Sequence, residues 1–193
     1  MRALLIALSL VSFAVPAAAQ GDAKPAPLAP REAPSVRLER LFSELKRERN
    51  EKAAERVAAR IGEEWGRSGS ASVDLMMHWA REALEAKKHA VALDFLDQVV
   101  TLRPDYAEGW NRRATVHFAM SNYGKAMSDI ERTLRLEPRH FGALSGMAAI
   151  LKNTGRKASA LGVFERVLAV YPMMRSAQNE VATLAEELAG EAL

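Results

Sequence analysis

The chain has 193 residues but no cysteine, and only 6% of its residues are aromatic. Without cysteine there can be no disulfide bond, no thiolate metal site and no cysteine for lipid attachment. The fold must therefore be held together by its core alone. Alanine, leucine, arginine and glutamate dominate the composition, and this mixture favours helix over sheet.

An excess of charge of one sign is also missing. The formal net charge is only +3, and acidic and basic residues are interspersed along the chain. Nucleic-acid binding requires basic residues that cluster on one face. The interspersed pattern is more typical of a solvated helical surface, so we expect no nucleic-acid partner.

Long apolar runs are absent after the first part of the chain, and we expect no membrane span, which would need about 20 apolar residues. The N-terminus carries Arg2, an apolar run over residues 3–15 and three alanines at 17–19. This order is typical of a secretory signal peptide. We predict that residues 1–19 are removed by cleavage after Ala19 and that the chain is exported to the periplasm. An uncleaved N-terminal anchor is the alternative.

Residues 20–36 include four prolines among small and polar residues. This composition cannot build a core and predicts an extended linker. We expect the folded part to begin near Arg37.

Three prolines, Pro104, Pro138 and Pro172, follow one another at the same interval, since 138 − 104 and 172 − 138 both give 34. Each proline closes two runs of apolar residues at helical spacing, which are separated by a short breaker such as "MSNYG". A fixed period of this length indicates stacked repeats of helix, turn and helix.

The repeats agree in residue size as well as polarity, because small residues recur at two positions where paired helices approach closely. These residues are Ala80, Ala114 and Ala148 in the first runs, and Ala92, Ala126 and Ala160 in the second. With Trp110, Ile130 and Pro138, the middle unit resembles the pattern of the tetratricopeptide repeat (TPR) family. The resemblance covers about residues 73–172 and implies an all-α, right-handed solenoid of antiparallel helix pairs.

The middle unit departs from the family pattern at two places. Arg113 stands where leucine is usual, and His117 stands where tyrosine is usual. We expect Arg113 to lay its aliphatic stem along the core and to send its guanidinium into water. Trp79 and Trp110 are expected on the core face of their helices.

The flanking segments look like caps of the solenoid. Residues 37–72 are predicted to form a helical hairpin, a degenerate repeat or cap, whose second helix starts at the N-cap Asn50. Residues 173–193 are predicted to form a capping helix with a polar outer face. Between them lie three predicted repeats, at 73–106, 107–140 and 141–172.

No catalytic constellation stands out, and we expect neither catalysis, nor a cofactor, nor a metal. His78 and Glu82 have a spacing compatible with metal binding, but such a pair is common on charged helices. The stretch "RLEPRHFGAL" places His140 at the turn between two repeats, where an architectural role is expected rather than chemistry.

Stacked repeats leave a curved inner surface for binding, and the TPR resemblance implies that the first helix of each unit lines it. A protein or peptide partner with an acidic or carboxylate group would suit its mixture of apolar and basic residues. The candidate groove residues are Met77, Arg81, Leu84, Asn111, Arg112, Thr115, Phe118, Ser145 and Lys152.

The expected function is that of a non-catalytic interaction module or scaffold of the cell envelope. The main alternative is a structural subunit of an envelope assembly that contacts its partners through its terminal helices. An enzyme acting on envelope material is a distant third.

Overall fold

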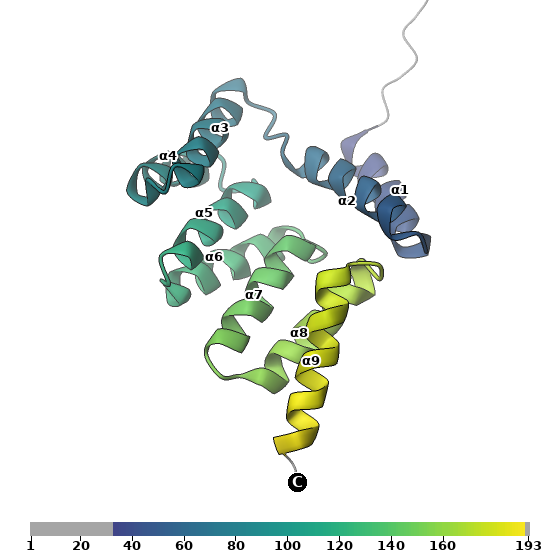
Figure 1. Ribbon diagram of the computed structural model, residues 1–193. Coiled ribbons are helices and arrows are strands. Elements are labelled where there is room, and N and C mark those ends of the chain that lie inside the picture. Colours follow the sequence, from purple (N-terminus) through teal and green to yellow (C-terminus); the bar gives the residue numbers. More distant parts are fainter. Residues whose placement is uncertain (1–32, 192–193) are drawn as a thin grey trace, which may run out of the picture. The chain divides into compact units, whose positions relative to one another are not determined.

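In the computed structural model, which describes residues 33–191, these residues form nine α-helices joined by short turns (Figure 1). The predicted signal peptide (1–19) and most of the predicted linker (20–36) lie outside the described residues. The helices are α1 (Pro34–Arg47), α2 (Glu51–Trp65), α3 (Ala71–Glu85), α4 (His89–Leu102), α5 (Ala107–Ala119), α6 (Tyr123–Leu136), α7 (Phe141–Asn153), α8 (Lys157–Val170) and α9 (Arg175–Glu191). The all-α prediction is confirmed.

Helix boundaries follow local chemistry. α1 begins at Pro34, inside the predicted linker, because proline without its N–H is well suited to the first turn of a helix. α2 begins as predicted after Asn50, whose side-chain Oδ1 accepts a hydrogen bond from Ala53 N at 2.9 Å. The second helix of each repeat ends shortly before its proline, for example at Leu136 before Pro138.

The turn inside each repeat has the same geometry three times. Lys87, Ser121 and Gly155 occupy the same place in successive periods and adopt φ angles of 58°, 59° and 77°. In each turn the next backbone N–H bonds back to a carbonyl of the preceding helix, as in Lys88 N to Ala83 O at 2.8 Å. This pattern is the Schellman motif, which ends a helix through one residue in the left-handed region.

Within the repeats, α3 pairs with α4, α5 with α6 and α7 with α8, as Figure 1 shows. The six small alanines predicted at the close approaches are all buried. α9 then packs on α8 and buries Ala177 and Leu184 in the same apolar cluster as Phe164. The fold is thus the TPR-type arrangement of helix pairs that the sequence predicts.

The N-terminal hairpin packs against the third repeat. Leu41, Phe42 and Leu45 of α1 share an apolar cluster with α2 and with Tyr171, which follows α8. Trp65, at the end of α2, lies 4.9 Å from Phe141 at the start of α7, measured between ring centroids. Residues far apart in the sequence therefore meet.

Charged side chains border this contact. Arg139 forms a bidentate ion pair with Glu39 of α1 at 2.8 and 2.9 Å, and its guanidinium lies 4.0 Å from the Phe42 ring centroid. Arg175, at the start of α9, pairs with Glu51 of α2 at 3.0 Å. The hairpin is thus held at the turns before α7 and α9.

The predictions for Trp79 and Arg113 are wrong. Trp79 is 41% exposed rather than buried in the core. The guanidinium of Arg113 forms two bonds to the buried Asp129, at 2.9 and 2.7 Å, and one to Asp97 at 2.9 Å, instead of turning to water. Because α4, α5 and α6 each contribute to this ion-pair cluster, Arg113 can replace leucine at a repeat interface.

Candidate functional site

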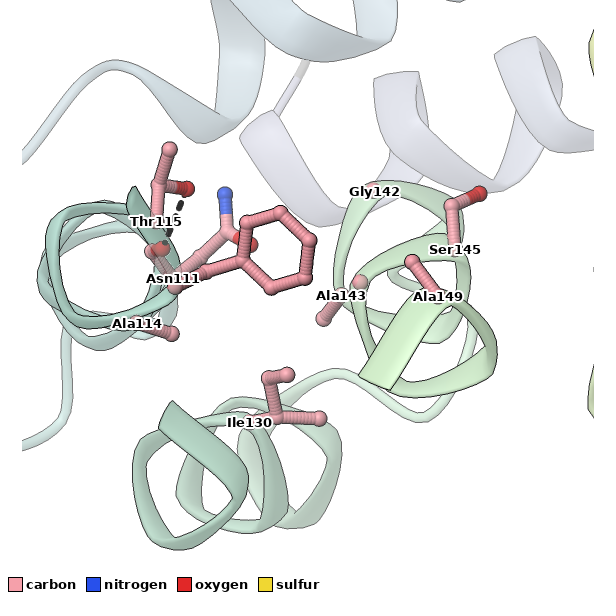
Figure 2. A pocket seen from close by; sticks show the side chains of 10 residues that line it. Asn111, Ala114, Thr115, Ile130, Gly142, Ala143, Ser145 and Ala149 are labelled. Atoms are coloured by element: carbon pink, nitrogen blue, oxygen red, sulfur yellow. Dashed lines mark hydrogen bonds between the residues drawn. The ribbon is translucent and has the colours of Figure 1, made fainter. Parts of the chain in front are cut away.

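The first helices of the second and third repeats border an apolar pocket with a volume of about 290 Å³. We refer to it as the α5–α7 pocket. Figure 2 shows side chains from three helices around it: Asn111, Ala114 and Thr115 from α5, Ile130 from α6, and Ala143, Ser145 and Ala149 from α7. Among the predicted groove residues, Asn111, Thr115, Phe118 and Ser145 line this pocket.

The pocket exists because α7 carries small side chains where it faces α5. Gly142, Ala143, Gly146 and Ala149 all line it. A Cβ atom at Gly146 would lie 3.4 Å from Ile130 Cδ1, so even one methyl group would touch the pocket floor. A pocket of this size and apolar character can hold one medium-sized side chain of a ligand.

Four other predicted residues line a separate hollow between α3 and α5. Met77, Arg81, Leu84 and Arg112 surround a volume of only about 20 Å³. This space is close to the size of one water molecule, so it acts as a contact surface rather than as a pocket. Lys152 lines neither hollow, and its Nζ forms an ion pair with Glu180 of α9 at 2.6 Å.

A buried carboxylate fixes the polar edge of the groove. Glu108, only 6% exposed, accepts hydrogen bonds from Asn111 Nδ2 at 2.9 Å and from Arg112 Nε at 2.5 Å. His140 Nε2 lies 2.9 Å from the same carboxylate. Burial alone would raise the pKa of Glu108, but its bonds to His140, Arg112 and Asn111 hold this pKa below its ordinary value.

His140 is a core residue with both ring nitrogens occupied. Its Nδ1 accepts a hydrogen bond from Ala143 N at 3.1 Å and so caps α7. In the neutral ring the proton therefore sits on Nε2, which donates to Glu108. The imidazole also stacks on Trp65, with 4.0 Å between ring centroids and 11° between planes. One histidine thus joins the groove edge to the N-terminal hairpin.

No pattern in the sequence indicates this link. Glu108 is one acidic residue among many, and His140 is expected at a turn, where the structure does place it. The contact between them spans 32 positions, close to one repeat.

The side of α5 that faces α4 and α6 carries the remaining unusual residues. His117 is buried, its Nδ1 has no hydrogen-bond partner within the described residues, and burial lowers its pKa. Trp110 is half-buried and lies under two guanidiniums, with Arg113 at 4.8 Å and Arg132 at 5.8 Å from its ring centroid. Trp110 is thus covered by cations rather than by the apolar core that we expected.

Within residues 33–191, no cluster of three or more acidic or histidine side chains could hold a metal ion. His78 Nε2 and Glu82 Oε1 are 3.3 Å apart, but both side chains are exposed and no third ligand from this range accompanies them. In the same part of the chain no helix is long and apolar enough to cross a bilayer.

Several solved structures with similar architecture are TPR domains. The first TPR of Spaghetti (RPAP3), bound to an HSP90 peptide, superposes with a TM-score of 0.59 and 22% identity, over 62% of this chain and 95% of that domain. The TPR2B domain of yeast Sti1, in complex with an Hsp70 peptide, gives a TM-score of 0.57 and 15% identity, over 61% and 99%. At these identities the similarity shows the fold alone.

Sequence relatives are more informative. A small glutamine-rich tetratricopeptide repeat-containing protein of Saccharomyces cerevisiae is 25% identical over 60% of this chain, which spans about a third (33%) of that relative. No family model matches the chain. A TPR repeat-containing protein of Rhizobium etli is 57% identical over 157 residues, which cover 81% of this chain and 77% of the relative. The chain belongs to the TPR repeat-containing protein family.

Proposed function

We propose that this protein is a non-catalytic interaction module that binds an extended peptide segment of a protein partner along α3, α5 and α7. One observation carries the proposal: an apolar pocket of about 290 Å³ lies beside a polar edge that Glu108 holds in place. The solved TPR domains of Spaghetti (RPAP3) and Sti1, which were captured with peptides, support the same use of the fold.

The geometry suggests the chemistry of the bound segment. The α5–α7 pocket accepts one apolar side chain, since its walls include alanine, glycine, isoleucine and phenylalanine. Arg112 remains 52% exposed while its Nε is bound to Glu108, and Arg81 faces the neighbouring hollow. A carboxylate on the peptide, positioned next to its apolar anchor, would meet these guanidiniums.

The predicted signal peptide indicates where in the cell the protein would act. An exported chain would meet its partner in the periplasm and would serve as an adaptor or scaffold of the cell envelope. Mass spectrometry of protein recovered from the periplasm checks this part, because cleavage after Ala19 leaves Gln20 as the first residue. Recovery only in the cytoplasm with residue 1 intact would contradict it.

Filling the pocket tests peptide binding. The partner is first isolated by affinity capture from envelope extracts and identified by mass spectrometry, and its binding is then measured with purified proteins. Ala149→Trp occupies the pocket from its wall, and we expect affinity to fall at least about tenfold, or about 1.4 kcal/mol. Arg81→Glu should also weaken binding, by like-charge repulsion.

The matched control is Ala169→Trp, which adds the same side chain at an exposed position of α8 outside the pocket. We expect this control to bind the partner normally. Equal thermal stability of the three variants ensures that a loss of affinity is local. If Ala149→Trp and Arg81→Glu both bind as tightly as the unaltered chain, the groove is not the binding site.

A further inference from the structure

A second apolar surface lies on the first repeat, away from the groove pocket. Leu75, Trp79 and Val91 are 45%, 41% and 42% exposed, and the Trp79 ring lies 5.4 Å from that of Phe95. Beside them is an open hollow of about 440 Å³, whose lining includes Trp79, Val91, Phe95, Glu82 and Lys88. We refer to these five residues and Leu75 as the first-repeat face.

The repeat period shows what kind of surface this is. Leu75 corresponds to Gly109 and Ala143, one and two periods later in the sequence, and both are buried. A Cβ at Gly109 would lie 2.8 Å from Val99 Cγ1 of the preceding repeat. In the second and third repeats, this position therefore packs directly on the repeat before it.

Trp79 occupies a second position of the same kind. Its equivalent in the second repeat, Arg113, reaches back to Asp97 of the first repeat at 2.9 Å. Its equivalent in the third repeat, Met147, packs against the apolar cluster of the second. The first-repeat face is thus an inter-repeat interface, and within residues 33–191 no preceding repeat covers it.

The N-terminal hairpin precedes this repeat in sequence but is engaged elsewhere. Trp65 stacks on His140, the N-cap residue of α7 in the third repeat. The connection to α3 is fixed as well, because Ser68 Oγ bonds to Asp74 Oδ1 at 2.6 Å and the Ser68 carbonyl accepts a hydrogen bond from Arg103. Moving the hairpin onto the first-repeat face would break all of these contacts.

Side-chain size argues against a further TPR repeat as the partner. Gly109 and Ala143 allow the backbones of neighbouring repeats to approach closely, whereas Leu75 at the same position would hold them apart. A broad apolar surface with an exposed tryptophan is instead typical of the centre of a protein–protein interface.

We propose that the first-repeat face binds the same face of a second copy of this chain in a twofold dimer. In such an interface each residue that contacts another is contacted by it in return. Glu82 and Lys88 border the same hollow with opposite charges. A twofold axis through this hollow, between the two charged side chains, would set Glu82 of one copy against Lys88 of the other, twice, with the apolar lining of the hollow packed around them.

The dimer carries two grooves, one on each copy. A partner with two peptide segments would then bind with an effective concentration set by their spacing. The inference stands apart from peptide binding, because no residue of the first-repeat face lines the α5–α7 pocket.

Sedimentation velocity on the full chain, over a range of concentrations, tests the dimer. We expect reversible dimers, and Trp79→Glu should weaken self-association at least about tenfold. Met120→Glu is the matched control, since Met120 is a similarly exposed apolar residue (39%) beyond the end of α5. Circular dichroism on both variants should show unchanged helix content. A monomer at all concentrations would overturn the proposal.

Charge exchange tests the twofold geometry itself. Glu82→Lys and Lys88→Glu should each weaken self-association, because each creates two like-charge pairs. An equal mixture of the two variants should form heterodimers, since both pairs are then opposite in charge. Weakening without recovery in the mixture would overturn the twofold arrangement.

A fluorescence quencher tests whether residues 1–32 cover the first-repeat face instead. If these residues shield Trp79 from the quencher in a monomer, that segment covers the face and the dimer proposal fails.

Discussion

At the scale of single residues, the carboxylate of Glu108 lies beneath the groove and is bonded to Asn111 and Arg112 of α5 and to His140, the N-cap residue of α7. Burying a carboxylate without such partners would destabilise the fold by roughly several kcal/mol, or the group would become protonated and neutral. Here the partners compensate for burial, and Asn111 and Arg112 are held in one orientation toward the groove. Preorganised side chains lose less entropy when a ligand binds.

Replacing this carboxylate should lower stability in a pH-dependent way. We expect Glu108→Gln to reduce the free energy of unfolding at pH 7 by about 1–3 kcal/mol, because charged hydrogen bonds to Arg112 and His140 are lost. The folded-state pKa of Glu108 lies below its unfolded value, so its contribution is complete above the unfolded pKa and is lost as pH falls through the folded one. The difference between the two proteins should therefore shrink in acid.

Urea unfolding at neutral and acidic pH measures both effects. The control is Glu131→Gln, an exposed position of α6, which should change stability little at either pH. A constant difference between the Glu108 variant and the unaltered chain at both pH values would show that the carboxylate's charge plays no part.

The groove was predictable at this scale only in part. The TPR resemblance and helical periodicity together selected Asn111, Thr115, Phe118 and Ser145, which line one pocket. The same periodicity placed Trp79 in the core, because the period cannot reveal whether a preceding repeat is there to cover it. Pairs such as Glu108 and His140 were not predicted either, since their chemistry arises from contact between α5 and the turn before α7.

At the scale of elements, the three turns inside the repeats share a backbone conformation that suits glycine best. Lys87 and Ser121 adopt the left-handed conformation that Gly155 adopts at the third turn. A side chain in this region costs roughly 1 kcal/mol because its Cβ crowds the backbone, whereas glycine has no Cβ.

Exchange of residues at these turns should have opposite effects. Lys87→Gly is expected to raise the free energy of unfolding by about 0.5–1 kcal/mol, and Gly155→Ala to lower it by about 1 kcal/mol. Urea denaturation of both variants provides the measurement. Gly124→Ala serves as control, because a Cβ there meets nothing within 4 Å and Gly124 lies in ordinary helix. It should be neutral or stabilising. A destabilised Lys87→Gly would mean that the lysine side chain makes a contact that outweighs the strain.

Elements were the most predictable level of the structure. The fixed period, its prolines and its small alanines predicted the helix pairs because these features act locally or between adjacent helices. The docking of α1–α2 was not predictable, since it depends on aromatic and ionic contacts between Trp65 and His140 and between Glu39 and Arg139. Neither contact produces a periodic pattern in the sequence.

At the scale of the described molecule, the hairpin adds a contact that a simple row of repeats lacks. In a solenoid each unit contacts only its neighbours, so stability is nearly a sum of local terms. Here α1 and α2 also contact the turns before α7 and α9. We therefore expect the hairpin and the third repeat to open together.

Trp65→Ala tests this coupling by removing the ring between the two regions. The substitution should lower stability by about 2–4 kcal/mol, because it removes aromatic contacts with His140, Phe141 and Phe42. Hydrogen exchange should show faster exchange in both α2 and α7, with α4 much less affected. Val36→Ala, at a 56% exposed position of α1, is the control. Faster exchange in α1 and α2 alone would show that the third repeat does not depend on the hairpin.

The hairpin's distant partners also have a consequence for synthesis of the chain on the ribosome. The apolar face formed by Leu41, Phe42 and Leu45 is complete once α2 has emerged, but Arg175, which pairs with α2, is made much later. At usual rates of translation, the interval between Trp65 and Arg175 lasts roughly 5–20 s. Throughout it the apolar face of the nascent hairpin is exposed to solvent and to chaperones. Residues made well after the hairpin thus complete the packing of α1 and α2.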